Sequence, residues 1–183
     1  MNKKKQRKAL KEQLKNFTGM IRLCAEEKIY HQLFMHPFWK EARIILTTMA
    51  MPFEIQTKPI IEQAWKENKT VAIPRTHYET KSLFFYELTD YQQLVKGTMN
   101  ILEPSSTCRK ISMDTDTLCI VPGLGFHQEK YRIGFGGGFY DRFLSNFPGH
   151  TISLAFHFQY PCIFLPDPYD VPVQAIITDC LSV

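Results

Sequence analysis

The sequence predicts a single-domain α/β fold in three layers, with a mostly parallel sheet flanked by helices. Short apolar runs alternate along the chain with segments whose apolar residues recur at helical spacing. The runs at 117–121 and 152–156 are apolar at nearly every position, which is typical of strands buried on both faces. The chain has 183 residues, of which 44% are hydrophobic, so one sizeable core over 1–183 is expected.

The N-terminal part, residues 1–36, is expected to be helical. Residues 3–17 carry apolar side chains along one helical face. A second helix is expected at 18–36, with Thr18 as its cap and Pro37 as its end. The basic start of this segment would then be presented on a regular scaffold.

Shorter elements follow. Before the glycine-rich segment we expect strand 43–49, helix 57–68, strand 70–74, strand 82–88, a brief helix at 90–96, a polar connection at 103–116 and strand 117–121. After it we expect an amphipathic helix carrying Phe139, Phe143, Leu144 and Phe147, then strands 152–156 and 174–178.

Cysteine usage and hydropathy exclude several classes of protein. The five cysteines are scattered and form no CxxC pair, which favours reduced thiols over a disulfide framework or a zinc site. The basic N-terminus is not followed by the apolar stretch of a secretory signal. No apolar run approaches the roughly 20 residues of a membrane helix. We therefore expect a cytoplasmic protein with no membrane partner.

Positive charge is concentrated at the N-terminus. Lys and Arg number 22 in the chain, and seven of them fall within residues 1–15 against the single acid Glu12. On a helix, Lys3 and Arg7 lie one turn apart and can hold one polyphosphate together. A solvated basic face is an alternative. A nucleic-acid arm is a further one, but interleaved aromatics are missing, so no nucleic-acid partner is expected.

The glycine-rich segment 132–142 is the main candidate for chemistry. Four of its residues are glycine, and Arg132 and Arg142 bracket them. Glycines let the backbone approach an anion closely, and free N–H groups can then point at phosphate oxygens. The spacing is neither a Walker A motif nor a true GxGxxG, and a plain glycine turn is the alternative. Asp141 could bind Mg²⁺ beside such a phosphate site.

Three further residues stand after predicted strands or in loops. Glu54 follows strand 43–49 and Arg75 follows strand 70–74, at the edge where ligands bind in open α/β sheets. Arg75 is a possible phosphate contact on this placement. Glu54 reads equally well as a surface-loop glutamate, and Asp170, in a proline-rich loop, has weaker support from spacing alone.

Taken together, these residues resemble the 5-formyltetrahydrofolate cyclo-ligase family. The family pattern is an N-terminal K-x₃-R helix, an acidic residue after the first strand, P-G-L-x-F, and R-L/I-G-x-G-x-G-Y-Y-D. This chain has Lys3 and Arg7, Glu54, the segment 122–126 (PGLGF) and the segment 132–141 (RIGFGGGFYD). Order and spacing match across nearly the whole length, and the last block is highly specific.

The resemblance implies an enzyme that converts 5-formyltetrahydrofolate to 5,10-methenyltetrahydrofolate with ATP and Mg²⁺, through phosphorylation of the formyl oxygen. It assigns ATP binding to Lys3, Lys4, Lys5, Gln6, Arg7, Arg132, Ile133, Gly134, Phe135, Gly136, Gly137, Gly138, Phe139 and Tyr140. It assigns folate binding to Met49, Glu54, Phe135, Gly136, Gly137, Gly138 and Phe139, and Mg²⁺ to Asp141 and Asp170.

Two positions depart from the family pattern. His127 stands where the family usually has Asp, and Phe139 replaces the first tyrosine of Y-Y-D. The first removes a carboxylate and the second a hydroxyl, while an aromatic ring remains for stacking. A non-catalytic nucleotide-binding protein of the same fold is therefore the second hypothesis. We expect a monomer or a weak dimer.

Overall fold

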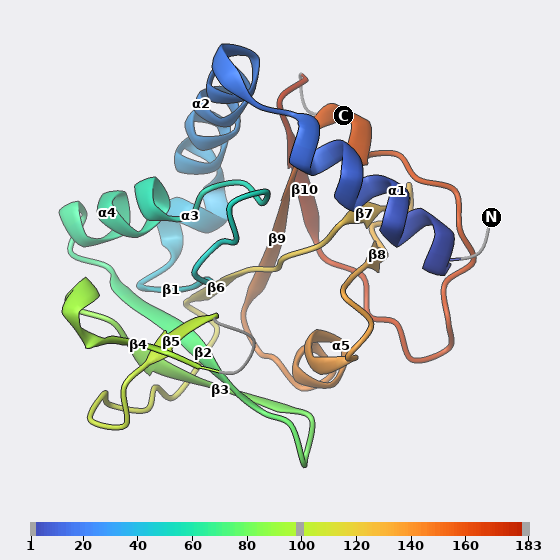
Figure 1. Ribbon diagram of the computed structural model, residues 1–183. Helices are drawn as coiled ribbons and strands as arrows, with labels where there is room; N and C mark the ends of the chain where they lie inside the picture. Colours follow the sequence, from blue (N-terminus) through green and yellow to red (C-terminus); the bar gives the residue numbers. More distant parts are fainter. Residues whose placement is uncertain (1–2, 98–100, 181–183) are drawn as a thin grey trace.

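The computed structural model describes residues 3–97 and 101–180, and a six-stranded sheet forms its centre (Figure 1). The strand order is β10-β9-β6-β1-β2-β3. All neighbours are parallel except β2 and β3. The strands are β1 Ile44–Leu46, β2 Thr70–His77, β3 Ser82–Glu87, β6 Thr117–Ile120, β9 His150–Ala155 and β10 Ala175–Thr178.

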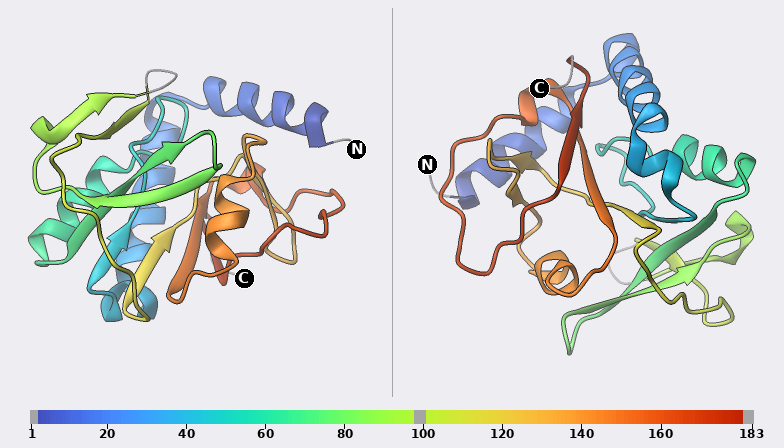
Figure 2. Two further views of the ribbon diagram at one scale, coloured as in Figure 1. Left: turned by 90° about the horizontal axis from the view of Figure 1, so that it is seen from below. Right: turned by 180° about the vertical axis from the view of Figure 1, so that it is seen from behind.

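Helices cover both faces of this sheet, as the sequence predicted (Figure 2). They are α1 Lys3–Asn16, α2 Gly19–Met35, α3 Pro37–Glu41, α4 Lys58–Lys66 and α5 Phe139–Leu144. Alternate strand residues point to opposite faces. Ile45 and Leu118 pack with α1 to α4 in the larger apolar cluster, whereas Leu46 and Cys119 pack with α5 in the smaller one.

The strand order places a crevice beside β1. From β1 the chain runs first to β2 on one side, and later to β6 on the other. This reversal is a topological switch point, where the loops at the carboxyl ends of two neighbouring strands diverge and leave room for a ligand. The two loops are 47–57 after β1 and 121–124 after β6.

Some local predictions were wrong. Residues 90–96, predicted as a brief helix, form the 3₁₀ turn η1 Tyr91–Gln93 and then strand β4 Leu94–Lys96. Strand β4 pairs with β5 Leu102–Pro104, which overlaps the start of the connection predicted at 103–116. Both strands are three residues long, too short for a period to be recognised. Strand 43–49 shortens to β1, and the helix after the glycines ends at Leu144.

A buried glutamine holds the loop that follows β6. Gln159 is 2% exposed and lies in the 3₁₀ turn η3 His157–Gln159 after β9. Its Nε2 donates to the carbonyl oxygens of Gly123 and Leu124, at 3.3 and 3.0 Å, and its Oε1 accepts from the Phe156 N–H. The carboxyl ends of β6 and β9 are therefore tied together beside the crevice, because a buried amide left without partners would be costly.

No helix in the described part of the chain is both long and apolar enough to cross a bilayer.

Candidate active site

The glycine-rich segment lies between a short hairpin and α5. The hairpin pairs β7 Gly125–Phe126 with β8 Arg132–Ile133. Residues 134–138 then turn into α5, with Gly136 at φ 97° and Gly138 at φ 68°. Both values lie in the region that side chains rarely adopt, so this path requires glycine at these two positions. We call residues 134–138 the glycine loop.

Helix α1 lies against the glycine loop through Arg7 (Figure 1). The Arg7 Nε donates to the Gly134 carbonyl oxygen at 2.9 Å. A methyl group placed on Gly136 would lie 3.5 Å from the Arg7 Cζ, and its terminal nitrogens are about as close. The flat end of the guanidinium therefore covers the loop at the residue with the most unusual backbone. Two segments more than a hundred residues apart in sequence meet here.

Lys3 contacts the second candidate metal ligand. Its Nζ lies 2.7 Å from the Asp170 Oδ2 and 2.6 Å from the Asp167 Oδ2. Burial lowers the pKa of Lys3, but the hydrogen bonds and charges of the two carboxylates outweigh this and raise it above its ordinary value. The Asp170 side chain is 17% exposed and that of Asp167 is 68% exposed. Asp170 is thus the inner member of the pair.

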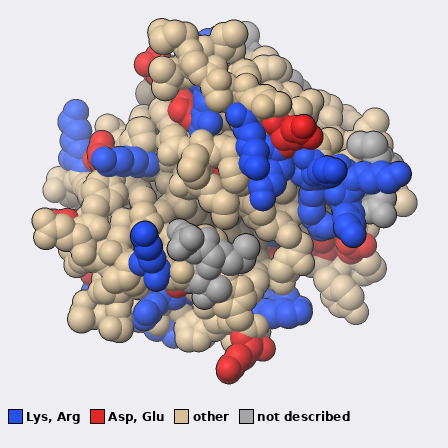
Figure 3. Space-filling model, viewed as in Figure 1, with Lys and Arg blue, Asp and Glu red and all other residues tan. Residues whose placement is uncertain are grey.

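The remaining side chains of the basic segment divide by helical face. Gln6 is buried, and its Nε2 donates to the Ile163 carbonyl oxygen at 2.6 Å. Lys4 and Lys5 are exposed. In Figure 3, lysine and arginine side chains gather over α1, so the positive surface and the glycine loop occupy one region of the molecule.

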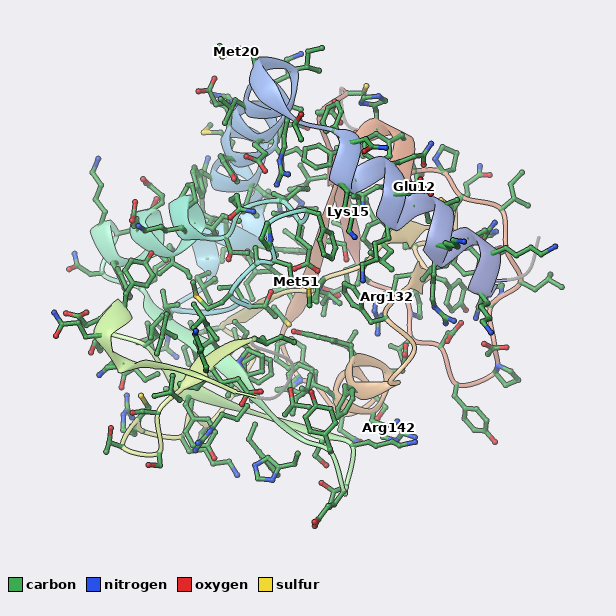
Figure 4. The ribbon with its side chains drawn as sticks, viewed as in Figure 1. Glu12, Lys15, Met20, Met51, Arg132 and Arg142 are labelled. Atoms are coloured by element: carbon green, nitrogen blue, oxygen red, sulfur yellow. The ribbon has the colours of Figure 1, made fainter. Side chains whose placement is uncertain are left out.

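Arg132 is buried beneath the glycine loop rather than exposed on it. Its side chain is 3% exposed, with one terminal nitrogen 2.8 Å from the Asp141 Oδ1 and the other donating to the Val171 carbonyl oxygen at 2.6 Å. The same Asp141 oxygen accepts from the Val171 N–H at 3.2 Å. Figure 4 shows Arg132 between α1 and α5. Arg132 therefore ties β8, α5 and the loop of Asp170 together.

Glu54 lies at the crevice beside β1. Its Oε2 accepts from the Met51 N–H at 2.8 Å. Burial raises the pKa of Glu54, while the Met51 hydrogen bond and the charge of Lys11 oppose this. The surrounding loop is fixed by α2, because Arg22 donates to the Pro52 and Glu54 carbonyl oxygens. A carboxyl group is thus held in a poorly solvated place by a rigid support.

A small cavity of about 50 Å³ opens beside Glu54 at the switch point. Loop 47–57, loop 121–123, α1 and Gln159 contribute to its walls, with Leu14, Thr47, Thr48, Ala50, Ile55, Thr57, Ile120, Val121, Pro122, Gly123 and Leu154 as further lining residues. Ligand pockets usually enclose roughly 300–1,000 Å³, so this cavity as it stands is smaller than a pterin with its side chain.

Aromatic contacts join the loop of Glu54 to the other segments. The ring of Phe53 lies 6.4 Å from that of Phe135 in the glycine loop, and the Lys11 Nζ of α1 lies 5.3 Å from the Phe53 ring. Phe135 is 48% exposed. Met49 packs against the larger apolar cluster behind this loop. Met51, in the same loop, also faces the space between α1 and α5 in Figure 4.

Three buried side-chain oxygens in the described residues have no hydrogen-bond partner: Thr47 Oγ1, Tyr140 Oη and Gln6 Oε1. Thr47 lines the cavity, Tyr140 is in the first turn of α5 after the glycine loop, and Gln6 lies on α1. Burial raises the pKa of Tyr140 well above its ordinary value, so this hydroxyl is a donor. Buried polar groups are nearly always paired, so each of these three oxygens is an exception.

Other predicted residues lie elsewhere or play lesser parts. Arg75 is inside β2, which runs on to His77, and its guanidinium lies 5.7 Å from the Tyr86 ring. Phe139 contacts Tyr78 edge to face. His127 is in the turn of the β7–β8 hairpin, where its Nδ1 accepts from the Glu129 N–H at 3.1 Å. His127 is thus a turn residue.

Four residues near the site were not predicted from the sequence: Gln159, Thr47, Lys11 and Phe53. Gln159 and Thr47 are ordinary polar residues next to strands, and only their burial distinguishes them. Lys11 is one of seven basic residues in its segment, so charge alone could not select it. The helical spacing of Lys3, Arg7 and Lys11, each one turn apart, is the signal that could have done so.

Comparison with known proteins agrees with this geometry. The 5-formyltetrahydrofolate cyclo-ligase family model matches residues 1–179. The 5-formyltetrahydrofolate cyclo-ligase of Escherichia coli strain K12 is 29% identical over 143 residues, covering 75% of this chain and 78% of that protein. The Mus musculus protein of that name is 27% identical over 184 residues, covering 93% and 90%.

A solved structure shows the same architecture. The NMR structure of Aquifex aeolicus 5,10-methenyltetrahydrofolate synthetase superposes with a TM-score of 0.83 at 27% identity, covering 100% of this chain and 92% of that one. The family match spans the K-x₃-R helix, Glu54 and the glycine loop, which are the segments that the structure brings together. The chain therefore belongs to the 5-formyltetrahydrofolate cyclo-ligase family.

Proposed function

We propose that this protein converts 5-formyltetrahydrofolate to 5,10-methenyltetrahydrofolate, using ATP and Mg²⁺ and releasing ADP and phosphate. Family membership supports the folate reaction. The observation that carries the ATP requirement is the meeting of α1 with the glycine loop and Asp170, through Arg7 and Lys3. A nucleotide and its metal ion need cations for the phosphates, a loop whose backbone can approach them closely, and a carboxylate for the metal. This region supplies all three.

The phosphates would bind between α1 and the glycine loop. Because the Arg7 Nε is held by the Gly134 carbonyl, the terminal nitrogens of the fork remain beside Gly136 and can bind phosphate oxygens. Lys3 would exchange its carboxylate partners for phosphate when the nucleotide arrives. Buried Arg132 would act from below, by holding Asp141 in place.

The folate would bind at the crevice beside β1. Glu54 would accept hydrogen bonds from pterin N–H groups, with Met49 and Phe135 as apolar walls. Since the cavity holds only about 50 Å³, its walls would have to move apart to admit the ring. We expect Phe53, next to Glu54, to move away from Phe135 in the same step.

The proposed chemistry has two steps. The formyl oxygen attacks the γ-phosphorus of ATP and ADP leaves, which converts a poor amide oxygen into a phosphate leaving group. N10 then attacks the formyl carbon, loses its proton, and phosphate leaves as the ring closes. Alignment and charge neutralisation supply most of the acceleration in phosphoryl transfer, so positioning by Lys3 and Arg7 matters more than a covalent step.

Asp141 and Asp170 would hold the Mg²⁺, which supplies neutralisation of phosphate charge. Each carboxylate uses one oxygen for protein hydrogen bonds, Oδ1 in Asp141 and Oδ2 in Asp170. The other oxygen of each is available as a ligand. This fits Mg²⁺, which usually takes one or two carboxylates and completes its shell with phosphates and waters.

The test of the proposed function is formation of 5,10-methenyltetrahydrofolate, followed by its absorbance. Purified protein with 5-formyltetrahydrofolate, ATP and Mg²⁺ should give product, with one ADP per product, and omission of ATP should stop the reaction. A non-catalytic nucleotide-binding protein would bind ATP and yield no product at high protein concentration, and that result would contradict the proposal.

The glycine loop gives a matched pair of variants. Gly136→Ala should raise the KM for ATP at least about tenfold, because a side chain at φ 97° is strained by roughly 1–3 kcal/mol and the loop must shift under Arg7. Gly134→Ala should change it little, since its methyl group would meet nothing within 4 Å. Equal effects of both variants would show that the loop backbone does not position ATP.

Asp167 and Asp170 both pair with Lys3, so variants of these two residues can distinguish a role in metal binding from a role in ion pairing. Asp170→Asn should raise the Mg²⁺ concentration for half-maximal activity by about tenfold or more, a loss of the size that weakened metal sites show. Asp167→Asn also removes a Lys3 partner but should have a much smaller effect, because Asp167 is largely exposed. If the two variants shift the Mg²⁺ dependence equally, Asp170 is not a metal ligand.

Replacing Glu54 with glutamine should weaken folate binding and should also remove a loss of stability that the wild type shows as pH rises. Glu54→Gln should raise the KM for 5-formyltetrahydrofolate at least about tenfold, since a hydrogen bond to a charged group contributes roughly 1.5–3 kcal/mol. Because burial raises its pKa in the folded state, wild-type stability should fall as pH rises from the ordinary value of 4.5 to the raised one. Urea unfolding should show that this fall is absent in Glu54→Gln.

The control for Glu54 is Glu12→Gln, at an exposed position of α1 (Figure 4). It removes the same charge and should leave the folate KM unchanged. A folate KM that is unaltered in a folded Glu54→Gln variant would remove Glu54 from the binding site.

A further inference from the structure

A histidine, a carboxylate and a thiol meet just beyond the carboxyl ends of β9 and β10, the two strands at one side of the sheet. His157 follows β9, and Asp179 and Cys180 follow β10. The two strands are parallel neighbours with Ala155 opposite Thr178, so residues just beyond their carboxyl ends are brought side by side. One ligand atom from each of the three residues lies within 4.8 Å of the other two. No other such group of three or more occurs among the described residues.

The side chains of His157 and Asp179 and the backbone of Cys180 are held in place by contacts within the protein. The Asp179 Oδ1 accepts from the His157 backbone N–H, and its Oδ2 lies 2.8 Å from the His157 Nδ1. Phe17 and Phe158 contact the His157 ring edge to face, with centroids 5.9 and 5.4 Å away. The Cys180 carbonyl oxygen accepts from the Thr178 hydroxyl at 2.8 Å.

We propose that His157, Asp179 and Cys180 form a binding site for a divalent cation of the zinc class. Thiolate, imidazole and carboxylate together are a ligand set that zinc takes, and Mg²⁺ prefers oxygen alone. Three protein ligands leave a fourth position for water, which the exposure of Cys180 and His157 permits. The sequence contains no CxxC pair that would indicate a zinc site. The proposed ligands come from two segments that only the folded chain brings together, so their spacing in sequence could not reveal them.

The ion would lie between the His157 Nδ1 and the Asp179 Oδ2, which are 2.8 Å apart. The imidazole proton moves to Nε2, and the Cys180 thiol loses its proton as the thiolate binds. One proton is therefore released for each ion bound, without any redox step. The bound ion would join the segment after β10 to the turn after β9.

This site is separate from the candidate active site. The proposed Mg²⁺ ligands Asp141 and Asp170 are not members of the cluster, and none of its residues lines the cavity beside Glu54. Zinc binding can therefore be measured without ATP or folate, and its outcome does not depend on whether the protein is a cyclo-ligase.

The first experiment uses the metal-free full-length protein and Zn²⁺ alone. Titration calorimetry should give one ion per chain, with release of about one proton seen as a dependence of the heat on buffer. Zn²⁺ should also protect Cys180 from alkylation, read by peptide mass spectrometry, while Cys24, which is also exposed, stays reactive. Alkylation of Cys180 that is equal with and without Zn²⁺ would overturn the site.

The second experiment uses variants. Cys180→Ser and His157→Gln should each weaken Zn²⁺ binding by more than the roughly tenfold loss that outer-shell changes cause. Cys24→Ser and Asp170→Asn should bind Zn²⁺ as the wild type does. Co²⁺ should show a thiolate charge-transfer band that is lost in Cys180→Ser and kept in Cys24→Ser. Unchanged affinity in Cys180→Ser and His157→Gln, or no binding by the wild type, would exclude the site.

Discussion

The loops of the candidate active site depend on one buried cation, Arg132. A guanidinium that is 3% exposed must have all its strong interactions supplied by the protein, and here Asp141 and the Val171 carbonyl supply them. Breaking a buried ion pair by removing one partner typically costs about 3–5 kcal/mol, because the other charge is left without compensation. The ends of β8, α5 and the Asp170 loop therefore keep one arrangement. Lys3 and Arg7 contact that arrangement, so the position of α1 follows from it.

Helix α1 is attached to the rest of the molecule by a mixed face. Leu10 and Leu14 pack into the larger cluster, and Gln6 and Arg7 donate to backbone carbonyls of two different loops. The apolar residues fix the distance of the helix from the sheet, and the polar ones fix its register along the glycine loop. The cations at its N-terminal end are thereby placed by contacts further along the same helix.

The sequence predicted the fold where its patterns were long enough. The apolar strands at 117–121 and 152–156 were located to within about two residues, because burial on both faces is visible in composition. The strands β4, β5, β7 and β8 have two or three residues each, so no period could reveal them. Their existence depends on pairing partners that only the folded chain supplies.

For the site, the sequence predicted residue types better than positions. The motif selected Arg132 for ATP and Asp141 for Mg²⁺, but spacing cannot show that the guanidinium is buried and paired with that carboxylate. Arg7 and Gly134 are 127 residues apart, and His157 and Asp179 are 22 apart. The second contact arises because β9 and β10 are parallel neighbours, whereas the first joins α1 to the segment after the antiparallel β7–β8 hairpin. Because the contacting residues are distant in sequence, no local sequence pattern indicates these contacts.

The glycine loop has a different neighbour on each side, and this bears on the proposed reaction. Arg7 contacts it at Gly134 and Gly136, on the side proposed for ATP. Phe53 contacts it at Phe135, on the side proposed for the folate. Under the proposed function, a folate that enters beside Glu54 and separates Phe53 from Phe135 would displace the loop that also contacts Arg7. A ligand that favours one position of this loop changes the affinity for the other ligand, and the effect is reciprocal. Under the proposed function, the glycine loop would therefore lie between the two substrates and couple their binding.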